Sequence, residues 1–311
     1  MTIRDIDHIH IVRIHLPKKS YHFIHTLPKN SVLHELLRSN PFLLLIGKGN
    51  IDVSLRQDEF EESYPMKLLV CISVTPETTA PIRFTEDGQS LITEGINYII
   101  NPYDEWYALV RAIELKEQYG GQVDIVHVGP ASHDVLLRKA LAIGADAAHR
   151  IDFQPKDAWQ AAYQIAHFAQ DRAYDIIFAG KETIDYQGAL VPGMVAEMLQ
   201  LPFASFINYL EVDGQHVKVR CEIEGGYEEY RMPMPLVVSA AKGLAEQRIP
   251  NMRGIMMAKR KPLEVIPPQE VPAKSECIGF EKPPQRSSVK LIDPDNVEEL
   301  VRLLHEEARV I

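Results

Sequence analysis

Runs of apolar residues alternate with segments of helical length between residues 66 and 200. The first run, KLLVCISV at residues 67–74, is nearly continuous, which is typical of a strand buried on both faces. Comparable runs follow at residues 122–129, 147–151 and 175–180. The segments between them predict helices from Asn101 to Gly120 and over residues 132–143, 157–169 and 190–199. Strands that alternate with such helices predict parallel βαβ units with right-handed crossovers.

Local signals indicate how these helices begin and which face they bury. At the first helix, Asn101 can act as the N-cap, Pro102 suits the first helical position and Asp104 supplies a capping-box-like acid. Gly120 and Gly121 end this helix. The second helix is predicted to share one face among Val135, Leu136, Lys139, Ala140 and Ile143.

The hydrophobic period changes after Pro202. The segments FINYLEV, HVKVRCEI and YEEYRM are separated by turns at Asp213-Gly214 and Gly225-Gly226, which predicts an antiparallel meander. Residues 235–241 then return to the pattern of a buried strand. Together these elements predict an α/β fold of the adenine nucleotide alpha hydrolase-like type over residues 66–261. Its sheet is expected to be doubly wound and mostly parallel, with a small meander.

Residues 262–311 have the pattern of a C-terminal arm. The segment is rich in proline as far as about residue 291, and an amphipathic helix follows, with Asp293-Pro294 as its cap. The residues predicted to face inward from this helix are Val297, Leu300, Val301 and Leu304. An arm that ends in an apolar helix face indicates docking on another subunit.

Residues 1–65 differ in character from the rest of the chain. They contain six of the twelve histidines, namely His8, His10, His15, His22, His25 and His34. Imidazoles at alternate positions can share a strand face, which leaves metal binding open, but carboxylate or cysteine companions are missing. We therefore expect no metal site, and we interpret the segment as a non-native or disordered extension with Met66 as the functional start.

Composition and charge exclude several classes of protein. The 311 residues are 46% hydrophobic, and the net charge of −10 argues against general nucleic-acid binding, which requires clustered lysine and arginine. The three cysteines lie far apart, so that no disulfide framework or zinc motif is indicated. The most apolar run, Phe42 to Ile46, is too short to span a membrane, and no signal-peptide core lies near Met1. We expect a soluble, cytoplasmic protein.

Candidate binding residues follow the ends of the predicted strands, because open parallel sheets bind ligands beyond the carboxyl ends of their strands. Four such segments are residues 71–75, 101–104, 128–130 and 180–193. Each alone is typical of an ordinary turn between strand and helix. Together they offer the backbone amides, glycines and helix N-termini that the phosphate of an adenine nucleotide requires. Neither the GxxxxGK[ST] loop nor a GxGxxG motif after the first strand is present.

Six ordered blocks of sequence carry a specific family resemblance. They are MKLLVCISV, NPYDEWYALVRAIELKEQ, VGPASHDVLLRKALAIGAD, DIIFAGKETIDYQGALVPGMVAEML, CEIEGGYEEYRMPMPLVVSA and IPNMRGIMMAKRKPLEVI. In this order they resemble an electron transfer flavoprotein beta subunit over almost all of residues 66–311. Residues 1–65 have no place in the resemblance, which supports their interpretation as an extension.

The resemblance implies a heterodimer whose alpha subunit carries the redox-active FAD, while the beta subunit binds AMP as a structural ligand. Such a heterodimer passes electrons from dehydrogenases, such as the acyl-CoA dehydrogenases of fatty acid oxidation, to a quinone reductase or another acceptor. No catalytic residue is implied in this chain. The family's nucleotide-binding positions match Cys71, Asn101, Pro102, Tyr103, Asp104, Val128, Asp185, Tyr186, Gln187, Gly188, Ala189, Leu190, Val191, Pro192 and Gly193.

The chain departs from the family pattern in the loop over residues 185–192. The family usually has Asp, Thr or Asn, and Gln there to hold phosphate, whereas side-chain donors are scarcer in this chain. Backbone amides near Gly188 and at the start of the following helix could take their place, because a helix N-terminus attracts anions. The resemblance also implies that Tyr103 borders the alpha subunit's flavin, although an exposed aromatic in a first turn is equally ordinary.

Residues 240–261 match the family's recognition loop, which docks on partner dehydrogenases. The docking residues implied are Met252 as the apolar anchor, with Arg253, Ile255 and Met256 beside it. Methionine is flexible and polarisable, which suits a surface that meets several partners. The alternatives are a buried loop methionine and, for Lys259, Arg260 and Lys261, a solvated run of charge.

Two other functions are compatible with the sequence. A bifurcating beta subunit would bind a second FAD in place of AMP and would oxidise NADH. The few donors of the 185–192 loop argue against it, since a second pyrophosphate needs more of them. A stand-alone adenine-nucleotide-binding stress or signalling protein would share the sheet, but it would have little use for the arm and the apolar final helix.

Overall fold

The computed structural model describes residues 2–6, 9–16, 19–25, 65–284 and 289–311, and the chain divides into two compact units near residue 60. The first unit contains an antiparallel sheet of β1 (Thr2–Ile6), β2 (Ile9–Leu16) and β3 (Lys19–His25). His8 and His34 lie outside the described residues. The predicted boundary before Met66 lies at the start of the described segment 65–284. The interpretation of residues 1–65 as a non-native extension stays a prediction.

A nine-stranded sheet forms the centre of the second unit, with strand order β12-β11-β10-β13-β9-β4-β7-β8-β14. Its neighbours are parallel from β10 to β14 and antiparallel only at β10-β11 and β11-β12. The predicted α/β fold with a mostly parallel sheet is therefore confirmed. The strands are β4 (Met66–Cys71), β7 (Gly121–Val128), β8 (Ala147–Ile151), β9 (Ile176–Gly180), β10 (Phe203–Asp213), β11 (His216–Ile223), β12 (Gly226–Pro233), β13 (Leu236–Ala240) and β14 (Leu263–Ile266).

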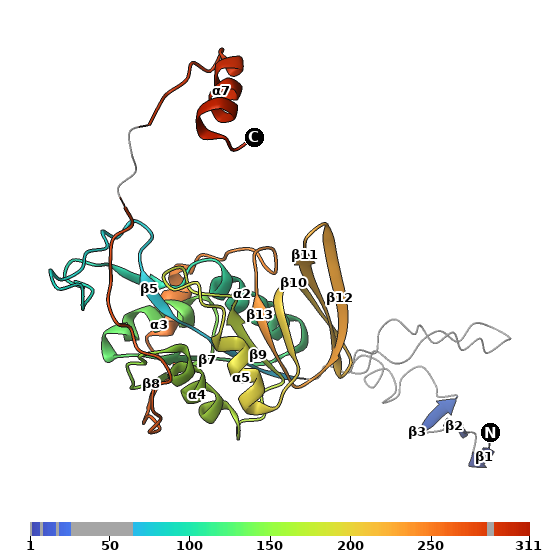
Figure 1. The fold of residues 1–311 in the computed structure, drawn as a ribbon. Coiled ribbons are helices and arrows are strands. Elements are labelled where there is room, and N and C mark those ends of the chain that lie inside the picture. Colours follow the sequence, from blue (N-terminus) through green and yellow to red (C-terminus); the bar gives the residue numbers. More distant parts are fainter. Residues whose placement is uncertain (1, 7–8, 17–18, 26–64, 285–288) are drawn as a thin grey trace. The chain divides into compact units, whose positions relative to one another are not determined.

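Helices cover both faces of this sheet (Figure 1). On one face lie α2 (Asp104–Tyr119), α3 (Asp134–Ile143) and α6 (Met252–Ala258), and on the other lie α4 (Ala158–Ala169) and α5 (Val191–Leu199). Successive side chains of a strand point to opposite faces, so Leu68 and Val70 of β4 pack in the first layer and Leu69 and Cys71 in the second. Burial on both sides explains the continuous apolar run that identified β4.

The direction in which the chain builds the sheet reverses beside β4. From β4 the chain passes through α2 to β7 and through α3 to β8, on one side of the first strand. Helix α4 then returns it to β9, which pairs with the other edge of β4. Such a reversal leaves a crevice at the carboxyl ends of the two strands, where α/β proteins bind their ligands.

Several predicted helix details are wrong. Helix α2 begins at Asp104, and its N-cap position is Tyr103, with φ of 69° and no side-chain cap, so Asn101 does not cap it. On α3, Val135 is 70% exposed, and the buried face consists of Leu136, Leu137, Ala140, Leu141 and Ala142. This face is rotated from the predicted one because α3 packs on α6 as well as on the sheet. By contrast, α4 and α5 match the predicted ranges, and Asp157 caps α4 by accepting a hydrogen bond from Gln160 N.

The first part of the arm packs on the α/β domain. After β14, which adds to the sheet edge beside β8, the side chain of Gln164 exchanges two hydrogen bonds with Gln269. Asp157 Oδ2 accepts hydrogen bonds from the backbone N–H groups of Lys274 and Ser275 at 2.6 and 2.9 Å. The last contact of this part is a stack of Phe280 on Phe84, with ring centroids 5.0 Å apart.

The final helix differs from its prediction in its cap. Helix α7 (Val297–Leu303) is capped by Asn296, which accepts a hydrogen bond from Glu299 N, and not by Asp293-Pro294. A short π-helical turn, η3 (Leu304–Ala308), continues it. Leu303 is buried, whereas the residues predicted to face inward are exposed or half-buried, namely Val297, Leu300, Val301 and Leu304. Among the described residues, the apolar side chains of α7 other than Leu303 are therefore at least partly exposed.

Candidate functional site

Asn101 joins two strand ends at the crevice between β4 and β9. Its side chain is fully buried, with Nδ2 donating to the carbonyl of Glu182 at 2.9 Å and Oδ1 accepting from Ile184 N at 3.0 Å. Its own backbone N–H donates to the carbonyl of Ser73, which follows β4. Both ends of the amide thus fix the segment that leaves β9, and this use explains why Asn101 is not a helix cap.

Glu105 fills the floor of the same crevice, and sequence reasoning missed it. Its Oε2 accepts a hydrogen bond from Ser73 N at 2.6 Å, and its Oε1 bonds the hydroxyl of Ser73. It lies so close to β9 that a Cβ at Gly180 would come within 2.6 Å of its Cγ. Burial raises the pKa of Glu105 to about 8, and the negative charges of Asp104 and Asp185 act in the same direction. An acid on the buried face of a predicted helix was the signal that could have identified it.

The loop over residues 185–190 projects from this fixed base into solvent. All six of its residues are exposed, and Tyr186 reaches 80% exposure. A turn bond from Gln187 N to the carbonyl of Thr183 shapes it, with positive φ at Gln187 and Ala189. Helix α5 follows with Pro192 in its first turn and no side-chain cap, so its first amide groups are open to an anion.

The turn after β7 is held by a pair of histidines. His127 Nδ1 lies 2.8 Å from the carbonyl of Ile72, which can only accept, so Nδ1 carries the proton and Nε2 is an acceptor. His133 Nδ1 then donates to that Nε2 at 2.8 Å. Desolvation lowers the pKa of His127 to about 4, which keeps the ring neutral. Val128 and Gly129 are thereby placed beside the crevice, and Arg150 fixes the carbonyl of Gly129 at 3.0 Å.

The remaining predicted residues of the crevice differ in their exposure. Tyr103 is 61% exposed, and Asp104 is half-buried beside Lys181, whose positive charge opposes the rise that burial causes in the pKa of Asp104. Cys71 is buried within the α4–α5 layer, and burial raises the pKa of its thiol. Cys71 can therefore pack or offer its backbone, but its thiol is not a reactive nucleophile.

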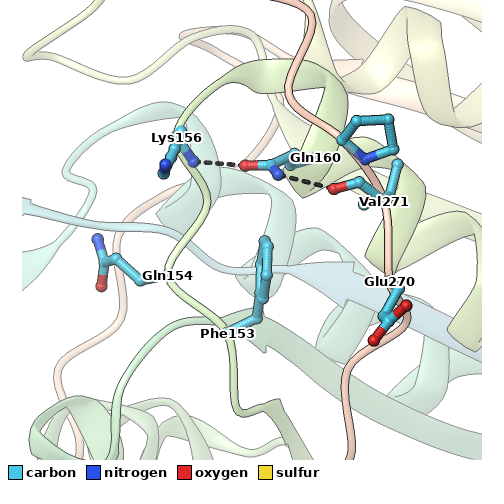
Figure 2. A pocket seen from close by; sticks show the side chains of 7 residues that line it. Phe153, Gln154, Lys156, Gln160, Glu270 and Val271 are labelled. Carbon is cyan, nitrogen blue, oxygen red and sulfur yellow. Dashed lines mark hydrogen bonds between the residues drawn. The ribbon is translucent and has the colours of Figure 1, made fainter. Parts of the chain in front are cut away.

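A separate hollow of about 570 Å³ lies beyond the end of β8 and beneath the arm (Figure 2). Its wall is held by Gln160, whose amide accepts from Lys156 N at 2.8 Å and donates to the carbonyl of Val271 at 2.9 Å. The predicted binding residues do not line it. Its lining residues are Phe153, Gln154, Lys156, Gln160, Glu270, Val271 and Pro272.

The predicted recognition loop contains the short helix α6, which exposes an apolar surface. Met252 and Met256 are 74% and 68% exposed, so the alternative of a buried loop methionine is wrong. Arg253 and Ile255 are exposed beside them. Lys261 does not belong to a solvated run of charge, because its Nζ donates to the carbonyls of Leu141 and Ala145 near the end of α3. Desolvation accordingly lowers the pKa of Lys261.

The described residues contain neither a cluster of metal ligands nor a helix that could span a membrane. Within them, histidine, cysteine and acidic side chains do not gather in groups of three or more that could hold a metal ion. In the same part of the chain, every helix is too short or too polar to cross a membrane.

Comparisons with known proteins find the same family by two routes. A family model described as the electron transfer flavoprotein domain matches residues 89–271. A protein of Bacillus subtilis (strain 168) named electron transfer flavoprotein subunit beta is 35% identical over 260 residues, which cover 79% of this chain and 100% of the relative. The human protein of the same name is 32% identical over 256 residues, covering 79% of this chain and 99% of its own length.

Proposed function

We propose, from the premise that the chain belongs to the electron transfer flavoprotein beta-subunit family, that it acts in a heterodimer with an FAD-bearing alpha subunit. In this assembly it binds AMP as a structural ligand. The heterodimer passes electrons from dehydrogenases, such as acyl-CoA dehydrogenases, to a quinone reductase or another acceptor. The family assignment confirms the resemblance found in the sequence. The cytoplasmic location stays a prediction.

The observation that carries the nucleotide proposal is the arrangement of Asn101, the 185–190 loop and the start of α5 at the carboxyl ends of β4 and β9. Asn101 fixes the base of the 185–190 loop, and the uncapped start of α5 follows that loop directly. Free amide groups at a helix start, with the helix dipole behind them, bind a phosphate without side-chain donors. The residues present therefore fit an AMP phosphate even though side-chain donors are few in this loop.

The chain's own part in electron transfer is to position groups. FAD, when bound by the alpha subunit, supplies the redox chemistry. Tyr103 is exposed next to the crevice, which is the place expected for a residue that borders the partner's flavin. The exposed apolar face of α7 would dock on the alpha subunit, since exposed apolar patches mark sites of protein–protein contact.

Docking of dehydrogenases is assigned to α6. Met252, Ile255 and Met256 form its exposed apolar surface, and flexible methionines adapt to partners of different shape. Met252→Ala should slow electron transfer from a dehydrogenase without releasing FAD. A matched control is Ile82→Ala, an exposed apolar truncation outside α6. Equal transfer rates for the two variants would remove Met252 as the anchor.

The decisive experiment is co-expression with an alpha subunit, followed by a count of FAD and AMP in the purified complex. We expect one FAD and one AMP for each heterodimer. Two FAD with reduction by NADH would replace this proposal with a bifurcating beta subunit. A stable monomer that does not bind the alpha subunit would instead favour the stand-alone nucleotide-binding protein.

A further inference from the structure

Glu105 is a buried acid whose charged neighbours are themselves acidic. The titratable groups that act on it are Asp104 of its own helix and Asp185 of the loop after β9, and Glu105 in turn acts on Cys71 of β4. The Cys71 thiol is neutral because burial raises its pKa. Lys181 is the basic group that acts on Asp104. An anion placed at the start of α5 would add another negative charge on the Asp185 side of Glu105.

The hydrogen bonds of Glu105 change with its protonation state. When Glu105 is ionised, both of its oxygens accept, so the N–H and the O–H of Ser73 both point inward to the carboxylate. When Glu105 is protonated on Oε1, its own O–H donates to Ser73 Oγ, and the hydroxyl hydrogen of Ser73 is released. Ser73 is only partly buried, so this hydrogen becomes available to an acceptor in the crevice.

We propose that Glu105 couples binding of the nucleotide's phosphate to uptake of one proton, with Ser73 as the group that senses the change. The inference rests on the proposed nucleotide site and names how that site recognises its anion. Protonation removes a negative charge from beneath the phosphate and turns the Ser73 hydroxyl into a donor for it. The proton comes from solvent and stays on the carboxyl group while the nucleotide is bound, so no bond other than O–H is made or broken.

Calorimetric titration of AMP into the full-length chain tests this coupling. Between about pH 7 and pH 9 the phosphate of AMP remains a dianion, because its second ionisation lies near pH 6. With a pKa of about 8, the protonated fraction of Glu105 falls from roughly nine-tenths to one-tenth over this range. The apparent affinity for AMP should therefore fall about tenfold, because it scales with the binding-competent fraction. At about pH 9, buffers of different ionisation enthalpy should report uptake of nearly one proton.

Two variants and one ligand give the controls. Glu105→Gln keeps a neutral side chain of the same shape, so its AMP affinity should not change over this range. Ser73→Ala keeps the charge but lacks the hydroxyl, and it should bind AMP more weakly at about pH 7 while still taking up a proton on binding at about pH 9. Adenosine, which has no phosphate, should bind the unaltered chain equally at both pH values.

The outcomes separate this inference from the function on which it rests. Binding of AMP without proton uptake or pH dependence overturns the coupling and leaves the nucleotide site intact. The same slope with pH in Glu105→Gln assigns the proton to another group and also overturns it. Failure of both AMP and adenosine to bind at any pH overturns the proposed nucleotide site, and the coupling with it. The proton count uses the unaltered chain, so a count of zero overturns the coupling even if a variant does not fold.

Discussion

Replacement of Asn101 by alanine tests how the edge of the crevice is held. The side chain is fully buried, and its two ends bond the carbonyl of Glu182 and the N–H of Ile184. These are the last fixed points before the exposed loop over residues 185–190. Alanine removes both bonds at once, and it leaves the backbone bond from Asn101 N to Ser73 in place.

The expected loss follows from the number and burial of these bonds. A hydrogen bond within a protein contributes about 0.5–1.5 kcal/mol net, and a fully buried partner left without a bond costs about 1–3 kcal/mol. Glu182 and Ile184 are only half-buried, so water can reach the groups that Asn101 leaves behind. We therefore take the lower range for each bond and expect a loss of about 1–3 kcal/mol in the free energy of unfolding.

Urea denaturation of the two proteins measures this loss, and amide hydrogen exchange locates it. The amide of Ile184 should exchange faster in Asn101→Ala, while the amides of β9 keep their protection. Asn97→Ala is the matched control, because Asn97 is exposed and its side chain bonds the carboxylate of the half-buried Glu77 at 3.1 Å. We expect it to cost less than about 0.5 kcal/mol. Equal stability of the two variants, with unchanged exchange at Ile184, would show that Asn101 does not hold the loop.

Three further predictions follow from contacts around the crevice and the arm. The pKa of Glu105 rises in the fold from 4.5 to about 8, so its contribution to stability is complete below about pH 4.5 and is lost as the pH rises toward 8. Urea titrations should therefore show that the free energy of unfolding of Glu105→Gln rises relative to that of the unaltered chain by about 1.4 kcal/mol per pH unit between about pH 5 and pH 8. The same pH dependence of stability in both proteins would contradict this. Gly180→Ala places a Cβ 2.6 Å from Glu105 Cγ and should lower the free energy of unfolding by about 1–3 kcal/mol. Gly188→Ala, with open space around its Cβ position, should lower it much less. Equal melting temperatures of the two variants would refute the packing argument. Asp157→Ala removes both the cap of α4 and the bond from Lys274 N that holds the arm. Limited proteolysis should therefore cut the arm faster than in the unaltered chain. An unchanged cleavage rate would mean that other contacts hold the arm.

Hydrophobic pattern predicted the centre of the sheet well because those strands are covered on both faces. The range of β8 was predicted without error, and β9 differs by one residue. The elements that the pattern missed are short and lie at the margins. Strand β14 has exposed or half-buried side chains and owes its place to pairing with β8. Helix α6 has seven residues, of which only Ala258 is buried, so it has no helical period of its own to detect.

The candidate site was predicted in its location but not in its chemistry. The strand-end rule identified the segments, because the reversal beside β4 follows from the order of strands and helices. The roles within the segments depend on partners far away in sequence. Asn101 bonds groups that lie 81 and 83 residues later, and Glu105 bonds Ser73, which lies 32 residues earlier. A local pattern that is compatible with a helix cap cannot reveal that tertiary contacts use the same amide.

The structure also indicates why the proposed nucleotide would be structural. The crevice is rigid from below, where Asn101 and Glu105 tie β4, α2 and the end of β9 together. It is open from above, where the side chains of the 185–190 loop are exposed and α5 begins without a side-chain cap on its first amides. A phosphate bound there would satisfy amides that the fold leaves open and would fix the loop from its outer side. Because a ligand that binds only the native state adds about 2.7 kcal/mol at a hundredfold excess over its Kd, AMP in this position would stabilise the chain without taking part in electron transfer.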